Sequence, residues 1–429
     1  SPKVSPVTPE IPVVQLNYTG SDGREKVTNA ADADGNIVDG IIYSPKEADL
    51  ITLFFGNKND YSGDNMTLDD ALNLSRSTYF LGLASDFCAF VENDFTASAA
   101  DCEGRIAAGG DISFKGEWNY QIGSGDYASM TALRYTDNYS NETVKETGNV
   151  VSGYAHVICG GKLYRINHLS TGKGRQSDSN MHKYSGGALT VYYDVDEDVF
   201  KRFLVGDVAG SLHLSDEKED IPFSISHKHE YPGECGDNCT HDYLGNVNEL
   251  AQMYEYPDLK KVITSIFATL RSRSDTLYSI GGIPAKETSG NSILFEAPEG
   301  TTDSTIYFYL PEWKLSYNEV RFKNIPEDAN IVINCGNEGE VKIQHGGTVK
   351  TYFVNSNNQI IKDISNQGGN SSNNSKDSER IIYNYPKATN LDISCNYNGT
   401  ILAPNADVTS SFNCEGHLSG ALIAKSSFI

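Results

Sequence analysis

The chain is dominated by short apolar runs that are bounded by glycines and polar turns. Several runs alternate apolar and polar residues, as Glu319-Val-Arg-Phe322 does. Runs of this length, rich in Ile, Val, Phe and Tyr and closed by turn residues, predict β-strands. The predicted strands include Ser292–Phe295, Thr305–Leu310, Glu319–Phe322, Ile331–Asn334 and Val341–Ile343, and further strands at 150–159, 187–193 and 50–55.

Two short segments near the C-terminus repeat each other. Gly399-Thr-Ile-Leu-Ala and Gly420-Ala-Leu-Ile-Ala are offset by 420 − 399 = 21 residues. Offsets of this size indicate stacked units that cannot bury an apolar face alone. We interpret them as successive coils of a β-solenoid, with adjacent strands of a sandwich as the alternative.

A further echo lies near the start of the chain. Cys102-Glu-Gly104 precedes the small apolar segment Ile106–Gly110, and Cys414-Glu-Gly416 precedes a similar segment. If similar segments pack on each other, the two ends of the chain form neighbouring coils. The solenoid is then discontinuous, with the middle of the chain inserted.

Helices are expected at two places. Leu259, Val262, Ile263, Ile266, Phe267 and Leu270 form one apolar stripe, which predicts an amphipathic helix at 257–273 packed along a wall of the solenoid. A shorter helix is expected from Thr67 to Leu74, with Thr67 as its N-cap. The acidic surroundings argue against membrane binding by the longer helix.

Composition sets the domain plan. We expect a Pro-rich linker at 1–13, an N-terminal cap region at 14–77 and a β-solenoid domain at 78–429. An irregular segment at 214–245 is inserted in that domain, and the polar segment 355–379 is expected to be a mobile loop.

Several blocks together resemble a known family. Leu81-Gly-Leu-Ala-Ser-Asp-Phe-Cys88, Glu103-Gly-Arg-Ile-Ala-Ala-Gly-Gly-Asp111, Ile331–Gly336, Tyr383-Asn-Tyr-Pro386 and Gly399–Ala406 resemble, in this order, the choice-of-anchor A domains of bacterial surfaces. That family is similar to ice-binding-like β-solenoid adhesins. The resemblance covers roughly residues 78 to 427.

The resemblance sets the expected fold and location. The fold is expected to be mainly β, a discontinuous right-handed β-solenoid (β-helix) with one long amphipathic α-helix alongside and long polar loops. The chain is expected to be a monomeric domain of a larger protein displayed on the bacterial cell surface. Its anchor is expected to lie outside this sequence.

The net charge of the chain limits the classes of partner that it can bind. The 34 Lys and Arg against 57 Asp and Glu give 34 − 57 = −23 at neutral pH. Nucleic acids and anionic membranes are recognised by clustered Lys and Arg, so both are poor partners. No apolar run is long enough to insert directly into a membrane.

One cluster has the residue types of a zinc site. It consists of His227, His229, Cys235, Cys239 and His241. Imidazole and thiolate groups can hold tetrahedral Zn²⁺. The resemblance implies export, and in an oxidising compartment Cys235 and Cys239 can instead close a small disulfide loop. Residues without any such link are the third alternative, and all three stay open.

A second segment has the residue types of a calcium loop. Asp32, Asp34, Asn36 and Asp39 alternate oxygen donors around Gly35, as Ca²⁺ loops do. The twelfth-position Glu of an EF-hand is missing, and solvated turn residues explain the pattern equally well.

No catalytic motif emerges. The sequence contains neither a Gly-x-Ser-x-Gly elbow nor a P-loop. Its many carboxylates single out no acid–base pair, so a polysaccharide-active β-helix enzyme is only an alternative. An ice-binding-like domain is the other, although the chain has no Thr-x-Thr triplet of the kind that ice-binding faces present.

We therefore predict a non-catalytic adhesin that binds a host matrix protein or a glycan. Exposed aromatic side chains can stack on sugar rings or bury against a protein ligand. The candidates for ligand binding are Trp118, Tyr120, Tyr127, Tyr184 and Tyr192. Packing within strands is the alternative role for these residues.

Overall fold

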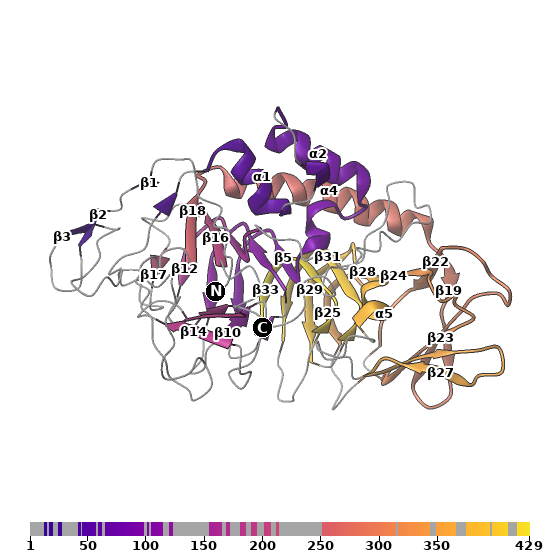
Figure 1. The fold of residues 1–429 in the computed structure, drawn as a ribbon. Helices are drawn as coiled ribbons and strands as arrows, with labels where there is room; N and C mark the ends of the chain where they lie inside the picture. Colours follow the sequence, from indigo (N-terminus) through magenta and orange to yellow (C-terminus); the bar gives the residue numbers. More distant parts are fainter. Residues whose placement is uncertain are drawn as a thin grey trace. The chain divides into compact units, whose positions relative to one another are not determined.

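The protein is described here from a computed structural model (Figure 1). It describes 45–56, 59–61, 65–97, 101–102, 104–114, 120–122, 154–164, 169–171, 181–185, 190–194, 201–206, 212–213, 251–314, 316–343, 349–365, 375–394, 397–410 and 418–429, with short strands at 13–14, 17–19, 25–27 and 42–43.

The chain divides into two compact units. The first unit comprises Ser1–Ala71, Asn93–Tyr127 and Asn149–Thr264. The second comprises Leu72–Glu92, Ala128–Gly148 and Ser265–Ile429. Both units are mainly β, and in both the strands stack as parallel ladders.

The first unit has three ladders. Ladder 1A stacks β8 (Ile106–Ala108), β11 (Val157–Cys159), β16 (Lys201–Val205), β18 (Ala251–Glu255) and β4 (Ile42–Tyr43), with β1 (Val13–Val14) antiparallel at its edge. Ladder 1B stacks β6 (Phe95–Ala97), β9 (Ile112–Phe114), β12 (Leu163–Tyr164) and β17 (Leu212–His213). Ladder 1C stacks β7 (Asp101–Cys102), β10 (Tyr120–Ile122), β13 (Leu169–Thr171) and β15 (Thr190–Asp194), with β14 (Met181–Ser185) antiparallel. A separate hairpin joins β2 (Asn17–Thr19) and β3 (Glu25–Val27).

The second unit repeats this plan. Ladder 2A stacks β19 (Ile283–Pro284), β22 (Thr305–Leu310), β24 (Asn330–Cys335), β28 (Ile381–Asn384), β31 (Thr400–Thr409), β33 (Leu422–Phe428) and β5 (Ala89–Val91), all parallel. Ladder 2B stacks β25 (Gly339–Ile343), β29 (Ala388–Ile393) and the second halves of β31 and β33. Ladder 2C stacks β21 (Ser292–Glu296), β23 (Glu319–Lys323) and β26 (Lys350–Val354) in parallel, with β20 (Lys286–Thr288) and β27 (Ile360–Asp363) antiparallel at its edges. A short parallel pair joins β30 (Tyr397–Asn398) and β32 (Leu418–Ser419).

The 21-residue repeat is one coil of this stack. Ile401 pairs with Leu422 and Tyr397 pairs with Leu418, each at the predicted offset. Gly399 and Gly420 open the two coils with φ of 137° and 136°, so they occupy the same corner. The solenoid-like reading is confirmed at this level, and the sandwich alternative is wrong.

The two ends of the second unit also meet. Strand β33 pairs in parallel with β5, so that Ile423 lies opposite Phe90. A late segment therefore stacks directly on an early one, as a discontinuous solenoid requires. The echo at Ile106–Ala108 lies in the first unit, where it pairs with Val157–Cys159.

The core of the second unit lies between its ladders. Phe295, Phe322 and Phe353 form a column along ladder 2C, with 5.4 Å between successive ring centroids. Phe295 also meets Phe308 of ladder 2A at 5.3 Å. Aromatic columns of this kind bury large areas and fix strand register.

The long helix α4 (Leu259–Ile280) continues past the predicted end at residue 273. In the second unit its Phe267 stacks on Phe90 at 5.6 Å, and Figure 1 shows it running over the strands of ladder 2A. Arg271 holds both carboxylate oxygens of Glu92 at 2.7 and 2.8 Å. The predicted packing of this helix along a wall of strands is confirmed.

The expected strand at 50–55 is wrong, because these residues form helix α1 (Glu47–Phe55). Glu47 and Asp49 stand in its first turn, where they favour the helix dipole, and Asp49 accepts a bond from the Lys46 amide. Buried Arg105 donates to the carbonyls of Leu53 and Phe54 at the other end. The prediction failed because residues 50–55 are almost all apolar, and a continuous apolar run lacks the polar positions whose spacing distinguishes a strand from a helix.

The other short elements follow the sequence more closely. Helix α2 (Leu68–Thr78) begins after Thr67, whose hydroxyl accepts a bond from the Asp70 amide as predicted. Short 3-10 helices cover Asn59–Tyr61 and Gly82–Asp86. The segment 355–379 is not one loop, because it holds β27 and helix α5 (Ser375–Glu379).

Candidate functional site

The ladders of the second unit differ in what they leave exposed. Strand β24 of ladder 2A is buried at every residue, because the core lies on one side and α4 on the other. Strands β22 and β23 instead alternate buried and more exposed residues, as β21 does from Ile293 and β25 does from Glu340. Alternation of this kind marks a sheet with one solvated face. The outward face of ladder 2C is therefore available to a ligand.

Charged residues lie in register across this face. Ser292, Glu319 and Lys350 form one row, Leu294, Arg321 and Tyr352 the next, and Glu296 and Lys323 the third. Arg321 pairs with Glu319 at 3.0 Å and lies over the Tyr352 ring at 5.7 Å. Neighbouring rows thus hold one another in place by opposite charge and by cation–π contact.

The two residues of the third row form an ion cluster with Lys286, which lies opposite Leu294 on β20. Glu296 Oε2 lies 2.7 Å from Lys286 Nζ, and its Oε1 lies 3.6 Å from Lys323 Nζ. The hydrogen bond from Lys286, helped by the charge of Lys323, lowers the pKa of Glu296 below its ordinary value. The carboxylate therefore keeps its charge well into the acidic range.

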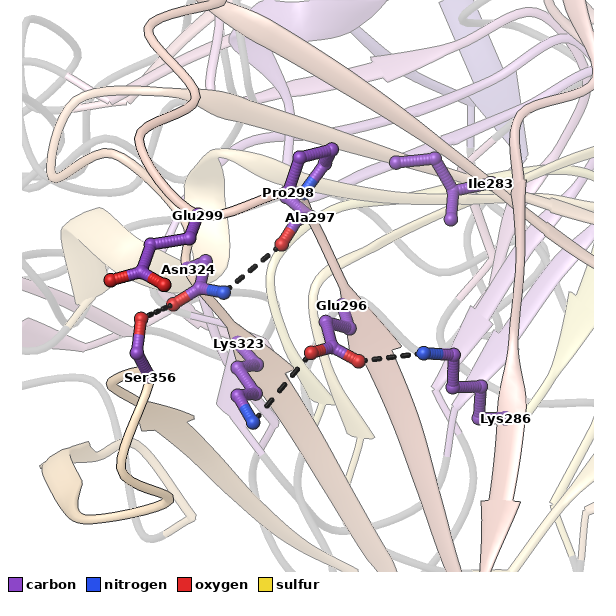
Figure 2. A pocket seen from close by; sticks show the side chains of 9 residues that line it. All are labelled: Ile283, Lys286, Glu296, Ala297, Pro298, Glu299, Lys323, Asn324 and Ser356. Carbon is purple, nitrogen blue, oxygen red and sulfur yellow. Dashed lines mark hydrogen bonds and ion pairs between the residues drawn. The ribbon is translucent and has the colours of Figure 1, made fainter.

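A pocket of about 350 Å³ opens beside this cluster (Figure 2). It lies where β21, β23 and β26 end, so residues from three parallel strands and the turns after them converge. It is open to solvent. Its lining comprises Ile283, Lys286, Glu296, Ala297, Pro298, Glu299, Lys323, Asn324 and Ser356.

Asn324 organises one wall of the pocket. It has a φ of 61°, a left-handed conformation that Asn tolerates better than most residues. Its amide nitrogen donates to the Ala297 carbonyl at 3.1 Å, and its amide oxygen accepts from the Ser356 hydroxyl at 2.8 Å. These bonds join the turns that follow all three strands into one rim (Figure 2).

The chemistry of this face suits recognition. General acid catalysis near neutral pH requires a carboxyl group with a raised pKa, and the shift at Glu296 has the opposite direction. Glu319 also has a lowered pKa: burial raises it, but hydrogen bonds from Ser292 and Arg321 outweigh that effect. What the face offers is a fixed array of charged donors and acceptors.

Three of the five predicted aromatic ligand residues lie on strands of ladder 1C. Tyr120 is in β10, Tyr184 in β14 and Tyr192 in β15. Tyr192 pairs with Lys183, and Tyr120 pairs with Leu169. The topology thus brings these backbone positions into one sheet of the first unit. Trp118 and Tyr127 lie outside the described residues.

The predicted metal ligands also lie outside the described residues. This holds for Asp32, Asp34, Asn36 and Asp39, and for His227, His229, Cys235, Cys239 and His241 with their zinc and disulfide alternatives. Among the residues that the structure does describe, no three His, Cys, Asp or Glu side chains converge as metal ligands.

Two of the described cysteines are buried thiols. Burial raises the pKa of Cys159 to about 12, and burial likewise raises the pKa of Cys335. Both therefore remain protonated at neutral pH and behave as small core residues.

The pocket residues are absent from the sequence-based predictions. Their signal was the alternation of Glu319, Arg321 and Lys323 with Val320 and Phe322, which places three charges on one strand face. That pattern was used only to predict a strand. Which neighbouring strands supply the opposite charges depends on the coil register.

The family is shown by comparison with known proteins. Residues 80–427, most of the chain, match the family described as "Putative Ice-binding-like adhesive domain". The chain belongs to this family of adhesive, ice-binding-like domains. An adhesive domain of this kind implies a role outside the cell or at a surface, and it suggests a non-catalytic protein. The narrower designation choice-of-anchor A stays a prediction.

Solved structures add little to the family assignment. Two solved structures of an ice-binding protein (LeIBP) from an Arctic yeast align with 82% of this chain and 93% of theirs, at 10% and 9% identity and TM-scores of 0.22 and 0.20. Similarity this low carries no argument about the site. No curated protein matches the chain. None of the helices in the described ranges combines the length and apolar character that crossing a bilayer needs.

Proposed function

We propose that this chain is an adhesive domain that recognises a host or environmental ligand, a protein or a glycan, through the outward face of ladder 2C, without making or breaking bonds. The observation that carries the proposal is the register of charged side chains on that face. Glu296, Glu319 and Arg321 are each held by a neighbouring charge before any ligand arrives. Such preorganisation lowers the entropic cost of binding.

The proposal includes a setting. The protein works at the bacterial cell surface as a domain of a larger protein, and its coils wind as a right-handed solenoid. Family membership supports a surface role, and the parallel ladders of both units support the coil. The proposal also includes a metal ion in the domain. This is either calcium at Asp32, Asp34, Asn36 and Asp39, or zinc at the His227 cluster.

The charged face argues against ice as the ligand. Ice-binding faces present regular rows of Thr, whereas the outward positions of β21 and β23 are Ser292, Leu294 and Glu296, and Glu319, Arg321 and Lys323. Strongly hydrated charges do not match a regular lattice of water. Ice-crystal shaping is therefore the outcome that would favour the alternative.

An array of glycans and matrix proteins, probed with the full chain, tests the proposal. Binding is expected, and Arg321→Glu is expected to weaken it at least fivefold, because the change places like charges beside Glu319. Lys261→Glu is the matched control, since Lys261 is exposed on α4 and belongs to the other unit. An EDTA arm tests the metal predictions.

Three results would overturn the proposal. The first is the release of reducing ends or unsaturated products from the arrayed glycans, which would show an enzyme. The second is ice-crystal shaping without ligand retention. The third is equal binding by wild type and Arg321→Glu, which would place recognition elsewhere on the molecule.

A further inference from the structure

The pocket at the end of ladder 2C has balanced charge. Lys286 and Lys323 contribute +2, and Glu296 and Glu299 contribute −2, so the lining sums to 2 − 2 = 0. A charged ligand would compete with these side chains for their ion-pair partners. One charge would then be left unpaired while water is displaced, and this costs binding free energy. The balance favours a neutral ligand.

The polar groups suit a ligand that both donates and accepts hydrogen bonds. Carboxylates only accept and ammonium groups only donate, whereas a hydroxyl does both. Glu296 and Lys323 present one acceptor and one donor side by side, separated by 3.6 Å. Neighbouring hydroxyl groups on a ring can bridge such a pair, and bonds to charged groups are the stronger ones.

The remaining walls are apolar. Ile283 and Pro298 line the pocket on the side away from Ser356, while Asn324 and Ser356 form the opposite rim (Figure 2). A pyranose ring has the same division, with hydroxyls around its edge and C–H groups on its face. The volume of about 350 Å³ lies at the small end of ligand sites and accepts a saccharide unit.

The surface beside the pocket can continue the contact. Leu294 and Tyr352 lie in register with Arg321 on the same outward face, one row before Glu296 and Lys323. Residues two apart along a strand are about 7 Å apart, so this row lies within reach of the next sugar of a chain that is bound in the pocket. A chain of sugars entering the pocket would therefore cross the row of Leu294, Arg321 and Tyr352, whose leucine and tyrosine can pack against a sugar face.

We propose that this pocket binds a neutral saccharide unit of a surface glycan, with Glu296 and Lys323 holding its hydroxyls and Pro298 and Ile283 packing on its ring. The inference rests on the proposed adhesive function and narrows its ligand from a protein or glycan to a neutral glycan.

Saturation-transfer NMR on the full chain tests this with the methyl glycosides of glucose, galactose and mannose, and with glucuronate and N-acetylneuraminate as charged probes. At least one neutral glycoside is expected to bind more tightly than both charged sugars. Glu296→Gln is expected to weaken that binding at least tenfold, and Lys261→Met, outside the pocket, to leave it unchanged. Circular dichroism confirms that each variant is folded.

A second variant tests charge balance without touching the ion cluster. Glu299 is exposed at the pocket edge, and Glu299→Gln changes the lining from 0 to +1. Preference is expected to move toward glucuronate, by about threefold or more in relative affinity. Unchanged preference would contradict the charge argument.

The failures of the two proposals are distinguishable. Adhesion to proteins or charged glycans that is unaffected by Glu296→Gln, or tighter binding of charged than of neutral sugars, overturns the saccharide inference and leaves the adhesive function standing. Absence of both adhesion and sugar binding overturns both.

Discussion

Gly420 shows how closely two coils approach at a corner of the second unit. Its φ is 136°, a backbone conformation that residues with a side chain rarely adopt. A Cβ placed there would lie well within van der Waals contact distance of the Gly399 carbonyl oxygen, because the neighbouring coil supplies backbone at that point. The residue therefore has two separate reasons to be glycine.

Replacing Gly420 by alanine is expected to lower the free energy of unfolding by about 2–4 kcal/mol, from backbone strain plus the clash. Gly300→Ala is the matched control. It has a φ of 79° but open space around it, so only the strain cost of about 1 kcal/mol is expected. Urea unfolding of both variants measures the difference. Equal losses would show that the coils do not touch at this corner.

Cys159 and Cys335 carry a prediction about thiol reactivity. Thiolates are the reactive form, and burial keeps both groups protonated. Iodoacetamide is expected to leave both unmodified in the native protein and to modify both in guanidinium chloride, as peptide mass mapping would show. Modification under native conditions would contradict their place in the core.

Glu296 sets the pH range of the candidate site. Its pKa is lowered in the folded protein, so its ion pairs are complete above the ordinary Glu value of about 4.3 and are lost as the pH falls through the lowered pKa. Ligand binding is expected to stay constant from about pH 7 to pH 5 and to fall only below the ordinary Glu pKa of about 4.3. Measurement of ligand binding as a function of pH checks the expectation. The Glu296→Gln variant is the control, and its weaker binding is expected to show no loss at low pH. A decline centred near pH 6 would point to another group.

At the scale of elements, α4 is fastened to ladder 2A by buried amides. Asn384 donates to the Ser274 carbonyl at 2.9 Å and to the Asn334 side chain at 3.0 Å. Asn334 in turn donates to the carbonyls of Leu277 and Gly281 at 2.7 and 2.8 Å. The two asparagines are in register on β24 and β28, so they join adjacent coils to one helix.

Asn384→Ala is expected to destabilise the protein by about 2–3 kcal/mol, since it leaves buried polar groups of Asn334 and Ser274 without this partner. The Asn334→Ala and Asn384→Ala losses are expected to be less than additive in the double variant, because the residues share one network. Thr276→Ala, on the exposed side of the helix, is expected to change stability by less than about 0.5 kcal/mol. Thermal or urea unfolding measures all four proteins, and full additivity would contradict the network.

The same elements show where sequence patterns failed. The stripe from Leu259 to Leu270 predicted α4 because one face of that helix is solvated. The run Leu50–Phe55 misled because α1 buries nearly all of these residues, so no polar positions marked its period. Segment 355–379 was mistaken for one loop because β27 is an exposed edge strand of four residues, whose Ile360 and Ile361 lie in a mostly polar stretch.

For the whole molecule, charge decides which partners are excluded. A net charge of −23 spread over 429 residues repels polyanions at long range. The full chain is expected to pass through a heparin column without retention at about 0.15 M salt and to stay unretained at lower salt. Elution that requires added salt would reveal a basic patch and reopen anionic partners.

The sequence alone determined the local features: strands with one solvated face, the amphipathic helix, the 21-residue coil and the family blocks. Each of these features depends only on residues that are close along the chain. A period of two, a helical stripe or a repeat offset in the sequence therefore predicts it directly. The tertiary structure decided which strands share a ladder, and with that the candidate site. Glu296, Lys323 and Ser356 come from three coils, and only the stacking register brings them to one pocket. Register arises from long-range packing of core columns such as Phe295, Phe322 and Phe353, which no local pattern contains.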